Sequence, residues 1–135
     1  VFEFDRLALE ALEKGVAVSG LDRMRLQVHA GDFIQSSRAF DAGASSMGSF
    51  DGVLVDPPRP GLGNFLDAIE SHAAQAHWIY VSCFPESFAK DAAKLQSRGL
   101  TLDAITVVEQ FPYTHHFEIV AAFSRSTESS AFSRD

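Results

Sequence analysis

Hydrophobic residues follow two different periods along the chain, and each change of period marks an expected helix or strand. Within residues 5–18 they recur every three or four positions, which predicts a helix with Gly15 near its end. The same spacing returns after Asn64, which would cap a second helix, and after Pro85, a residue favoured at the first helical position. The last of these three helices is expected to end at Arg98-Gly99.

Strand-like segments lie between and after these helices. Four are short hydrophobic runs, and the last two alternate hydrophobic with other residues, as strands with two different faces do. A segment rich in Ser, Ala and Gly, residues 35–49, is expected to form a loose connection with at most one helical turn. The six expected strands are residues 1–4, 26–28, 50–55, 78–81, 100–108 and 116–123.

Strands that alternate with helices predict an α/β fold, in which helices cover a mostly parallel sheet that finishes in an antiparallel pair. Ligands bind beyond the carboxyl ends of the strands in such sheets. Several reactive side chains fall at those ends, although an acid can follow a strand simply because loops are polar. These side chains are Glu3, Asp32, Asp56, Cys83 and, at the start of an antiparallel last strand, Glu118.

The composition excludes several classes of protein. With 135 residues, 46% of them hydrophobic, the chain is at most one soluble domain, and no hydrophobic run approaches membrane-spanning length. One cysteine excludes a disulfide framework or a multi-cysteine metal site within these residues and indicates a reducing compartment, which we expect to be the cytoplasm. The net charge of −7 argues against electrostatics as the main grip on nucleic acid, but it allows local basic contacts.

Cys83 stands where the hydrophobic run 78–81 stops and just before Pro85 begins the third helix. In such a strand-to-helix turn, the free amide groups and the dipole of the helix N-terminus favour a thiolate. A reactive cysteine is therefore one interpretation. The other is a small buried hydrophobic side chain, which is the commoner fate of a free cysteine.

Three sequence blocks resemble those of the S-adenosylmethionine-dependent RNA (uracil-5-)-methyltransferases. The family patterns are D-P-P-R-x-G, Y-V-S-C-N-P and F-P-x-T-x-H-x-E. The corresponding blocks occur in the same order, within residues 50–123: Asp56-Pro57-Pro58-Arg59-Pro60-Gly61-Leu62, Tyr80-Val81-Ser82-Cys83-Phe84-Pro85 and Phe111-Pro112-Tyr113-Thr114-His115-His116-Phe117-Glu118. The resemblance implies a Rossmann-like class I methyltransferase fold, S-adenosylmethionine as cofactor, and methylation of carbon 5 of a uridine in a structured tRNA or rRNA.

The resemblance also implies roles for the residues that match these blocks. Cys83 would be the nucleophile that adds to carbon 6 of uracil, and Glu118 the base that removes the carbon 5 proton. Asp56 would orient either the target base or the amino group of the methyl donor. His116 would hold Glu118 in place or only fill a polar edge. Arg59 would contact an RNA phosphate or pair with a neighbouring carboxylate.

By analogy with the methyltransferase fold, two further carboxylates would bind the donor. Glu3 would accept hydrogen bonds from both ribose hydroxyls, and Asp32 would face the adenine amino group. In the methyltransferase fold, a first strand followed by a glycine-rich loop cradles the donor. This strand and loop are absent from this chain, and the strand would lie between the Glu3 strand and the Asp56 strand. We therefore expect residues 1–123 to be part of a catalytic domain that upstream residues of the same protein complete, and residues 124–135 to be a disordered polar tail.

Phe84 is a second departure from the family, because Asn is usual after the cysteine. Phe is a poor residue at a helix N-cap, and stacking of Phe84 on an RNA base would be a substitute role. Two alternatives to the uracil-5 activity stay open. One is an amino-directed nucleic-acid methyltransferase with a D/N-P-P turn. The other is a catalytically degenerate RNA-binding or scaffold protein, against which the joint retention of Cys83 and Glu118 argues.

Overall fold

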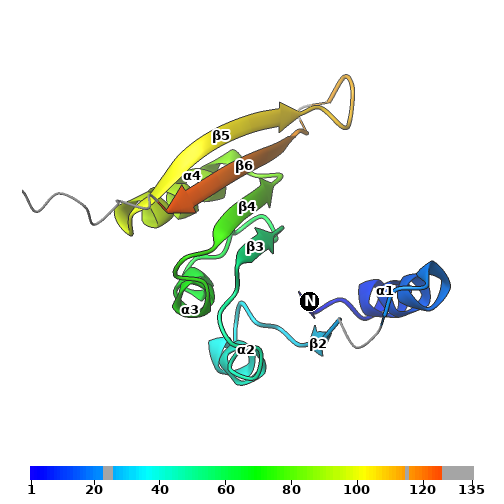
Figure 1. Ribbon diagram of the computed structural model, residues 1–135. Coiled ribbons are helices and arrows are strands. Elements are labelled where there is room, and N and C mark those ends of the chain that lie inside the picture. Colours follow the sequence, from blue (N-terminus) through cyan, green and yellow to red (C-terminus); the bar gives the residue numbers. More distant parts are fainter. Residues whose placement is uncertain (23–25, 115, 126–135) are drawn as a thin grey trace, which may run out of the picture. The chain divides into compact units, whose positions relative to one another are not determined.

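The computed structural model describes residues 1–22, 26–114 and 116–125, and the chain divides into two compact units (Figure 1). Unit 1 consists of the described residues of Val1–Ser49 together with Asn64–His72, and unit 2 of those of Phe50–Gly63 and Ala73–Asp135. The strands form two sheets, one of two strands in unit 1 and one of four strands in unit 2. No helix among the described residues is long and apolar enough to cross a membrane.

Unit 1 contains three helices and a short parallel strand pair, and aromatic side chains of β1, α2 and α3 pack together in it. Phe40 is 3% exposed, and its ring centroid lies 4.6 Å from that of Phe2 and 5.0 Å from that of Phe65. The strands are β1 (Phe2–Glu3) and β2 (His29–Ala30), and the helices are α1 (Arg6–Ser19), α2 (Ser37–Ala44) and α3 (Phe65–His72).

The first helix forms where the spacing of hydrophobic residues in 5–18 predicts it. The Asp5 carboxylate accepts the Ala8 backbone N–H at 2.8 Å, which satisfies one of the free amides of the first turn. The helix continues past Gly15 and ends at Gly20, whose φ of 71° suits a glycine at the end of a helix. Only Val16 of its hydrophobic residues is buried.

Two expectations for unit 1 are wrong. The strand expected at residues 26–28 lies at His29–Ala30, because backbone pairing with β1 sets its position: the Gly31 N–H donates to the Glu3 carbonyl at 2.9 Å. The loose connection expected at residues 35–49 contains α2, of two turns. Phe40 is its only large hydrophobic residue, but burial of Phe40 and Ala44 supplies packing that helix propensity alone does not reveal.

Unit 2 contains four of the six expected strands in one mixed sheet, whereas the first two strands pair separately in unit 1. The strand order of the mixed sheet is β3-β4-β6-β5, with β3 and β4 parallel and with β6 antiparallel to both of its neighbours. This arrangement, together with α4, which begins and ends where the sequence predicts, confirms the α/β class. The elements are β3 (Gly52–Val55), β4 (His77–Ser82), α4 (Pro85–Ser97), β5 (Leu100–Val108) and β6 (Glu118–Arg125).

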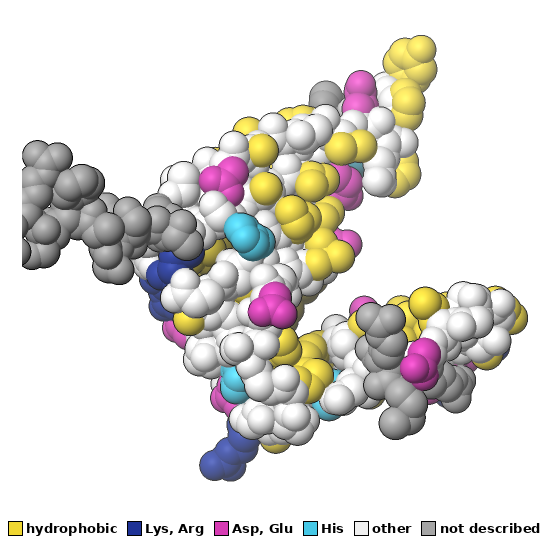
Figure 2. Space-filling model, in the orientation of Figure 1, with side chains coloured by type: hydrophobic (Ala, Val, Ile, Leu, Met, Phe, Trp, Pro, Cys, Tyr) yellow, Lys and Arg dark blue, Asp and Glu magenta, His cyan; other side chains and the backbone are white. Residues whose placement is uncertain are grey.

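The two faces of this sheet differ in burial. Trp78, Tyr80 and Phe123 are at most 1% exposed and belong to the core of unit 2 with Leu95 of α4, which lies along one face of the sheet (Figure 1). Figure 2 shows hydrophobic side chains on the surface of the sheet, where paired Leu54 and Ile79 are exposed. β6 continues two residues beyond Phe123, and the rest of the expected tail lies outside the described residues.

Candidate active site

The strand register of unit 2 places three of the candidate residues at one edge of the sheet. β3 and β4 run in parallel with Val55 beside Tyr80, so that Asp56 and Cys83 follow the carboxyl ends of neighbouring strands. β6 runs the opposite way beside β4, and Glu118 is its first residue (Figure 1). The topology therefore brings an acid, a thiol and a second acid to the same edge, and their catalytic roles stay predictions.

Hydrogen bonds of Ser82 shape the turn that carries Cys83. The Ser82 hydroxyl oxygen accepts the Phe84 backbone N–H at 3.1 Å and donates to the Phe84 carbonyl at 3.2 Å. Such a local hydroxyl–backbone pair closes the chain around the residue between them. Cys83 is exposed, so the alternative of a small buried hydrophobic residue is wrong.

The helix behind Cys83 starts as the sequence predicts, with Pro85 in the first turn and Phe84 at the N-cap. Phe84 has no side-chain cap hydrogen bond, which is the expected consequence of an aromatic residue where the family has Asn. Its ring instead lies under Arg59, whose guanidinium carbon is 4.7 Å from the ring centroid. Among the described residues Arg59 has no carboxylate within ion-pair distance, so the structure shows this cation–π contact and not the carboxylate pairing that was one of the two alternatives for Arg59.

His116 lies outside the strand that was expected to carry it. β6 begins only at Glu118, which is half-buried, whereas His116 is exposed and its backbone N–H donates to the Thr114 hydroxyl at 3.2 Å. The Thr114 hydroxyl in turn donates to the Phe111 carbonyl at 2.7 Å. The residues before Glu118 therefore form the hydrogen bonds of a turn and do not pair with a neighbouring strand. Residue 115 lies outside the described residues.

The two candidate donor-binding carboxylates lie in unit 1, at the ends of the paired strands β1 and β2. Glu3 is half-buried, and its Oε1 accepts the backbone N–H groups of Phe4 and Asp5, each at 2.7 Å. Asp32 is also half-buried, and its Oδ1 accepts the Gln35 N–H at 3.1 Å. Both side chains are fixed by backbone donors while remaining partly open to solvent, and both are acceptors. These properties fit the hydroxyl and amino donors of a nucleoside.

Asp91 is a residue whose importance the sequence analysis missed. It lies on α4, is only 4% exposed, and accepts hydrogen bonds from the Tyr80 hydroxyl and from the loop that follows β3. Burial, and then the hydrogen bond and charge of Asp91, raise the pKa of Tyr80 far above its ordinary value. The signal for Asp91 is its spacing: it stands between Phe88 and Leu95 at a position where a helix buries its hydrophobic face.

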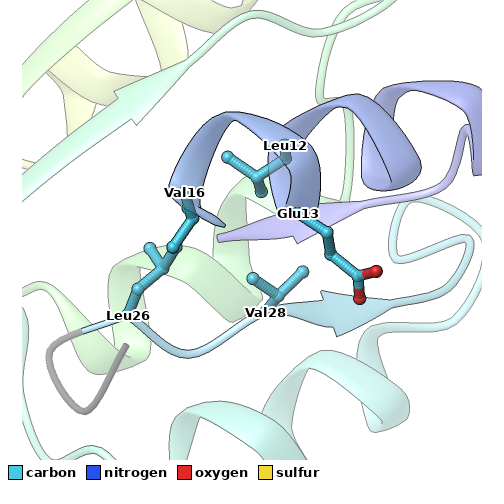
Figure 3. A pocket seen from close by; sticks show the side chains of 5 residues that line it. All are labelled: Leu12, Glu13, Val16, Leu26 and Val28. Carbon is cyan, nitrogen blue, oxygen red and sulfur yellow. The ribbon is translucent and has the colours of Figure 1, made fainter. Parts of the chain in front are cut away.

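A pocket of about 240 Å³ lies apart from these residues, within unit 1 (Figure 3). It is formed by α1 and by the segment before β2, and four of its five lining side chains are hydrophobic. They are Leu12, Val16, Leu26 and Val28, with Glu13 at one side. The pocket contains none of the candidate catalytic or donor-binding residues.

Solved structures define the class of protein. The ribosomal protein L11 methylase of Lactobacillus delbrueckii subsp. bulgaricus has the same fold, with a TM-score of 0.63 and 14% identity over 93% of this chain and 56% of its own. The tRNA (uracil-54, C5)-methyltransferase of Pyrococcus abyssi, solved with S-adenosyl-L-homocysteine, matches with a TM-score of 0.70 and 28% identity over 90% of this chain and 27% of its own. The fold is thus that of Rossmann-like methyltransferases.

Sequence relatives define the family within this class. The chain belongs to the tRNA (uracil-5-)-methyltransferase family, which matches residues 34–126, more than half of the chain. An RNA methyltransferase of Bdellovibrio bacteriovorus is 34% identical over 91% of this chain and 32% of its own length. The 23S rRNA (uracil(1939)-C(5))-methyltransferase of Chromobacterium violaceum is 42% identical over 61% of this chain and 16% of its own length. The chain therefore spans at most about a third of these relatives.

Proposed function

We propose that this chain is part of the catalytic domain of an enzyme that transfers a methyl group from S-adenosylmethionine to carbon 5 of a uridine in a structured tRNA or rRNA. The observation that carries the proposal is the exposed Cys83, held in a strand-to-helix turn at the sheet edge that Glu118 and Asp56 share. Membership of the uracil-5 family favours carbon 5 over an amino group as the acceptor. The S-adenosyl-L-homocysteine in the Pyrococcus abyssi structure supports this class of donor.

The residue types fit the chemistry of an unreactive carbon. S-adenosylmethionine, when bound, supplies an electrophilic methyl group, but carbon 5 of uracil is a weak nucleophile. The Cys83 thiolate would add to carbon 6 and turn the ring into an enolate, whose carbon 5 would take the methyl group as the methyl–sulfur bond of the donor breaks and S-adenosylhomocysteine leaves. Glu118 next removes the carbon 5 proton. The electron pair of that C–H bond re-forms the ring double bond as the sulfur of Cys83 leaves carbon 6.

The other candidate residues bind and orient. Asp56 orients the target base or the donor's amino group, and His116 lines the same end of β6. Arg59 and Phe84 form a cationic aromatic surface beside Cys83, which suits stacking on a nucleobase and attraction of a phosphate. In unit 1, Glu3 holds the ribose hydroxyls of the donor and Asp32 its adenine amino group.

Nucleoside analysis tests the proposal. The protein at its full natural length is incubated with methyl-labelled S-adenosylmethionine and with unmodified transcripts of tRNA and rRNA, and the labelled nucleoside is identified by mass spectrometry. We expect 5-methyluridine, and none with Cys83→Ala. A base methylated on an amino group would support the amino-directed alternative. RNA binding without any labelled nucleoside would support the degenerate one.

A further inference from the structure

One buried carboxylate holds the loop that follows β3, residues 56–63. Asp91 of α4 is 4% exposed, and its Oδ2 accepts both the Leu62 backbone N–H at 2.7 Å and the Tyr80 hydroxyl at 2.6 Å. Its Oδ1 accepts the Gly63 backbone N–H at 3.2 Å. All three donors come from outside α4, so this carboxylate connects the helix, the neighbouring strand and the loop.

The packing of α4 alone does not call for a charge at this position. Phe88, Ala92 and Leu95 fill the same face of the helix and are buried, and a hydrophobic residue would pack among them without a desolvation penalty. A buried carboxylate is tolerated only where hydrogen bonds satisfy it, and here two of the three donors are loop amides. Lys94, one turn further along α4, also donates to the Gly63 carbonyl at 3.1 Å.

The loop lies directly against the carboxylate. Gly61 has a φ of 80°, and a Cβ built on it would lie 2.6 Å from the Asp91 Oδ2, so no side chain fits between loop and helix. The Gly61 N–H donates to the Pro58 carbonyl at 2.8 Å, which closes a tight turn with Arg59 inside it. One end of this turn continues from β3, and the other end is the segment that Asp91 holds.

We propose that Asp91 is a positioning residue for RNA binding: by holding residues 61–63 to α4 and Tyr80, it keeps Arg59 over Phe84 beside Cys83. The structural connection between Asp91 and Cys83 is short. Tyr80, the partner of Asp91, lies on β4, which ends just before Cys83, and α4, which carries Asp91, begins just after Cys83. This inference rests on the proposed function, in which Arg59 and Phe84 contact the RNA.

Three substitutions in the protein at its full natural length test the inference. Asp91→Asn keeps the size and shape of the side chain but removes the charge and one acceptor oxygen. Tyr80→Phe keeps the ring and removes one donor. Leu95→Val is the matched control, because it removes one buried methylene from the same helix without removing a hydrogen bond to the loop.

The readouts are steady-state kinetics with RNA, the affinity for S-adenosyl-L-homocysteine, and hydrogen exchange at the Leu62 and Gly63 amides. Because misplaced binding groups weaken productive binding, Asp91→Asn is expected to lower kcat/KM by roughly 10- to 100-fold, mainly through a higher KM for RNA. The affinity for S-adenosyl-L-homocysteine is expected to stay that of the wild type. Tyr80→Phe and Asp91→Asn act on one network, so their effects on kcat/KM should not multiply in the double variant.

Two outcomes would overturn the inference. One is an Asp91→Asn variant that loses no more activity than Leu95→Val, which would make Asp91 a purely structural residue. The other is unchanged exchange of the Leu62 and Gly63 amides, which would show that Asp91 does not hold the loop. If the wild-type protein makes no 5-methyluridine, the proposed function fails separately. The amide exchange of the same variants then still decides whether Asp91 holds the loop.

Discussion

Ser82 and Glu118 each place a reactive group at the end of a strand, one by shaping the turn around Cys83 and the other by being the first residue of β6. A thiolate that adds to carbon 6 of uracil is released only after the carbon 5 proton has gone. In the proposed mechanism Cys83 and Glu118 therefore act in sequence, and a block at each step has its own chemical signature.

The first prediction concerns Cys83. RNA that carries 5-fluorouridine at the target position is expected to become trapped on this residue, because fluorine takes the place of the proton that must leave carbon 5. The adduct is measured by denaturing gel electrophoresis and peptide mapping with the protein at its full natural length. Cys83→Ser, whose hydroxyl is a far weaker nucleophile, is the control. An adduct mapped to another residue would contradict the assignment.

The second prediction concerns Glu118. Glu118→Gln is expected to methylate carbon 5 but to release the RNA slowly, since loss of a general base commonly costs about 10²- to 10⁴-fold in rate. A covalent RNA–protein species should therefore accumulate with ordinary uridine, detectable by the same gel. Glu109→Gln, an exposed acid between β5 and the turn, is the matched control and should turn over normally. Normal turnover by Glu118→Gln would show that another group takes the proton.

At the scale of elements, β4 and α4 are joined by the hydrogen bond between Tyr80 and Asp91. The pKa of Tyr80 is raised from an ordinary 10.0, first by burial and then by Asp91. In the unfolded chain Tyr80 loses its proton near pH 10, while in the folded protein it keeps it. The contribution of protonated Tyr80 to the free energy of unfolding is therefore complete below pH 10 and is lost as the pH rises above 10.

The third prediction follows from this difference. The free energy of unfolding is expected to fall above pH 10 by about 1.4 kcal/mol per pH unit through Tyr80 alone, and Tyr80→Phe should remove this slope. Denaturant unfolding at a series of pH values measures it. Tyr113→Phe removes the only other tyrosine hydroxyl, which is exposed, and should keep the wild-type slope. An unchanged slope in Tyr80→Phe would contradict the prediction.

Local patterns predicted the elements of unit 2 well and those of unit 1 less well. β5 matches its predicted bounds, because its alternation and the flanking Gly99 are strong local signals. α2 was missed, because Phe40 stabilises it through aromatic contacts with residues distant in sequence. The start of β6 was displaced by a turn whose hydrogen bonds Thr114 makes, and a hydrophobic pattern does not report such bonds.

The candidate site shows the same limit. The common position of Asp56, Cys83 and Glu118 at one sheet edge was predictable because each stands in a continuous sequence block at a strand end. Asp91 was missed because its partners are backbone amides of Leu62 and Gly63, which lie 29 and 28 residues away. Backbone donors do not produce a sequence motif. The only available signal was that an acid stands at a position where the helical spacing of α4 predicts a hydrophobic residue.

At the scale of the whole molecule, the strands divide between two sheets, and within the described residues β3 pairs only with β4. The sequence contains no glycine-rich strand-to-helix turn of the kind that cradles a nucleotide with backbone amides. The open edge of β3 leaves backbone N–H and C=O groups to water or to another strand, and such a group costs on the order of 1–3 kcal/mol when it is buried without a partner.

The fourth prediction is that these 135 residues alone bind S-adenosylmethionine weakly and catalyse no detectable methylation. Isothermal titration with the isolated chain measures the affinity, and the protein at its full natural length is the reference. Sedimentation checks the oligomeric state, because strand edges can also pair between copies. Micromolar binding by a monomer would show that the donor site forms without such a turn, and it would call the role of Glu3 into question.

Cys83 is the only thiol in these 135 residues, and it is exposed to solvent. A thiol-reactive dye will therefore label this chain at one place, inside the proposed RNA site. RNA that covers the strand-to-helix turn will slow the labelling, whereas RNA bound elsewhere will leave the rate unchanged. The Cys83 thiol can thus serve as a footprinting probe for occupancy of the proposed RNA site. Such an experiment needs neither a methyl donor nor an engineered cysteine.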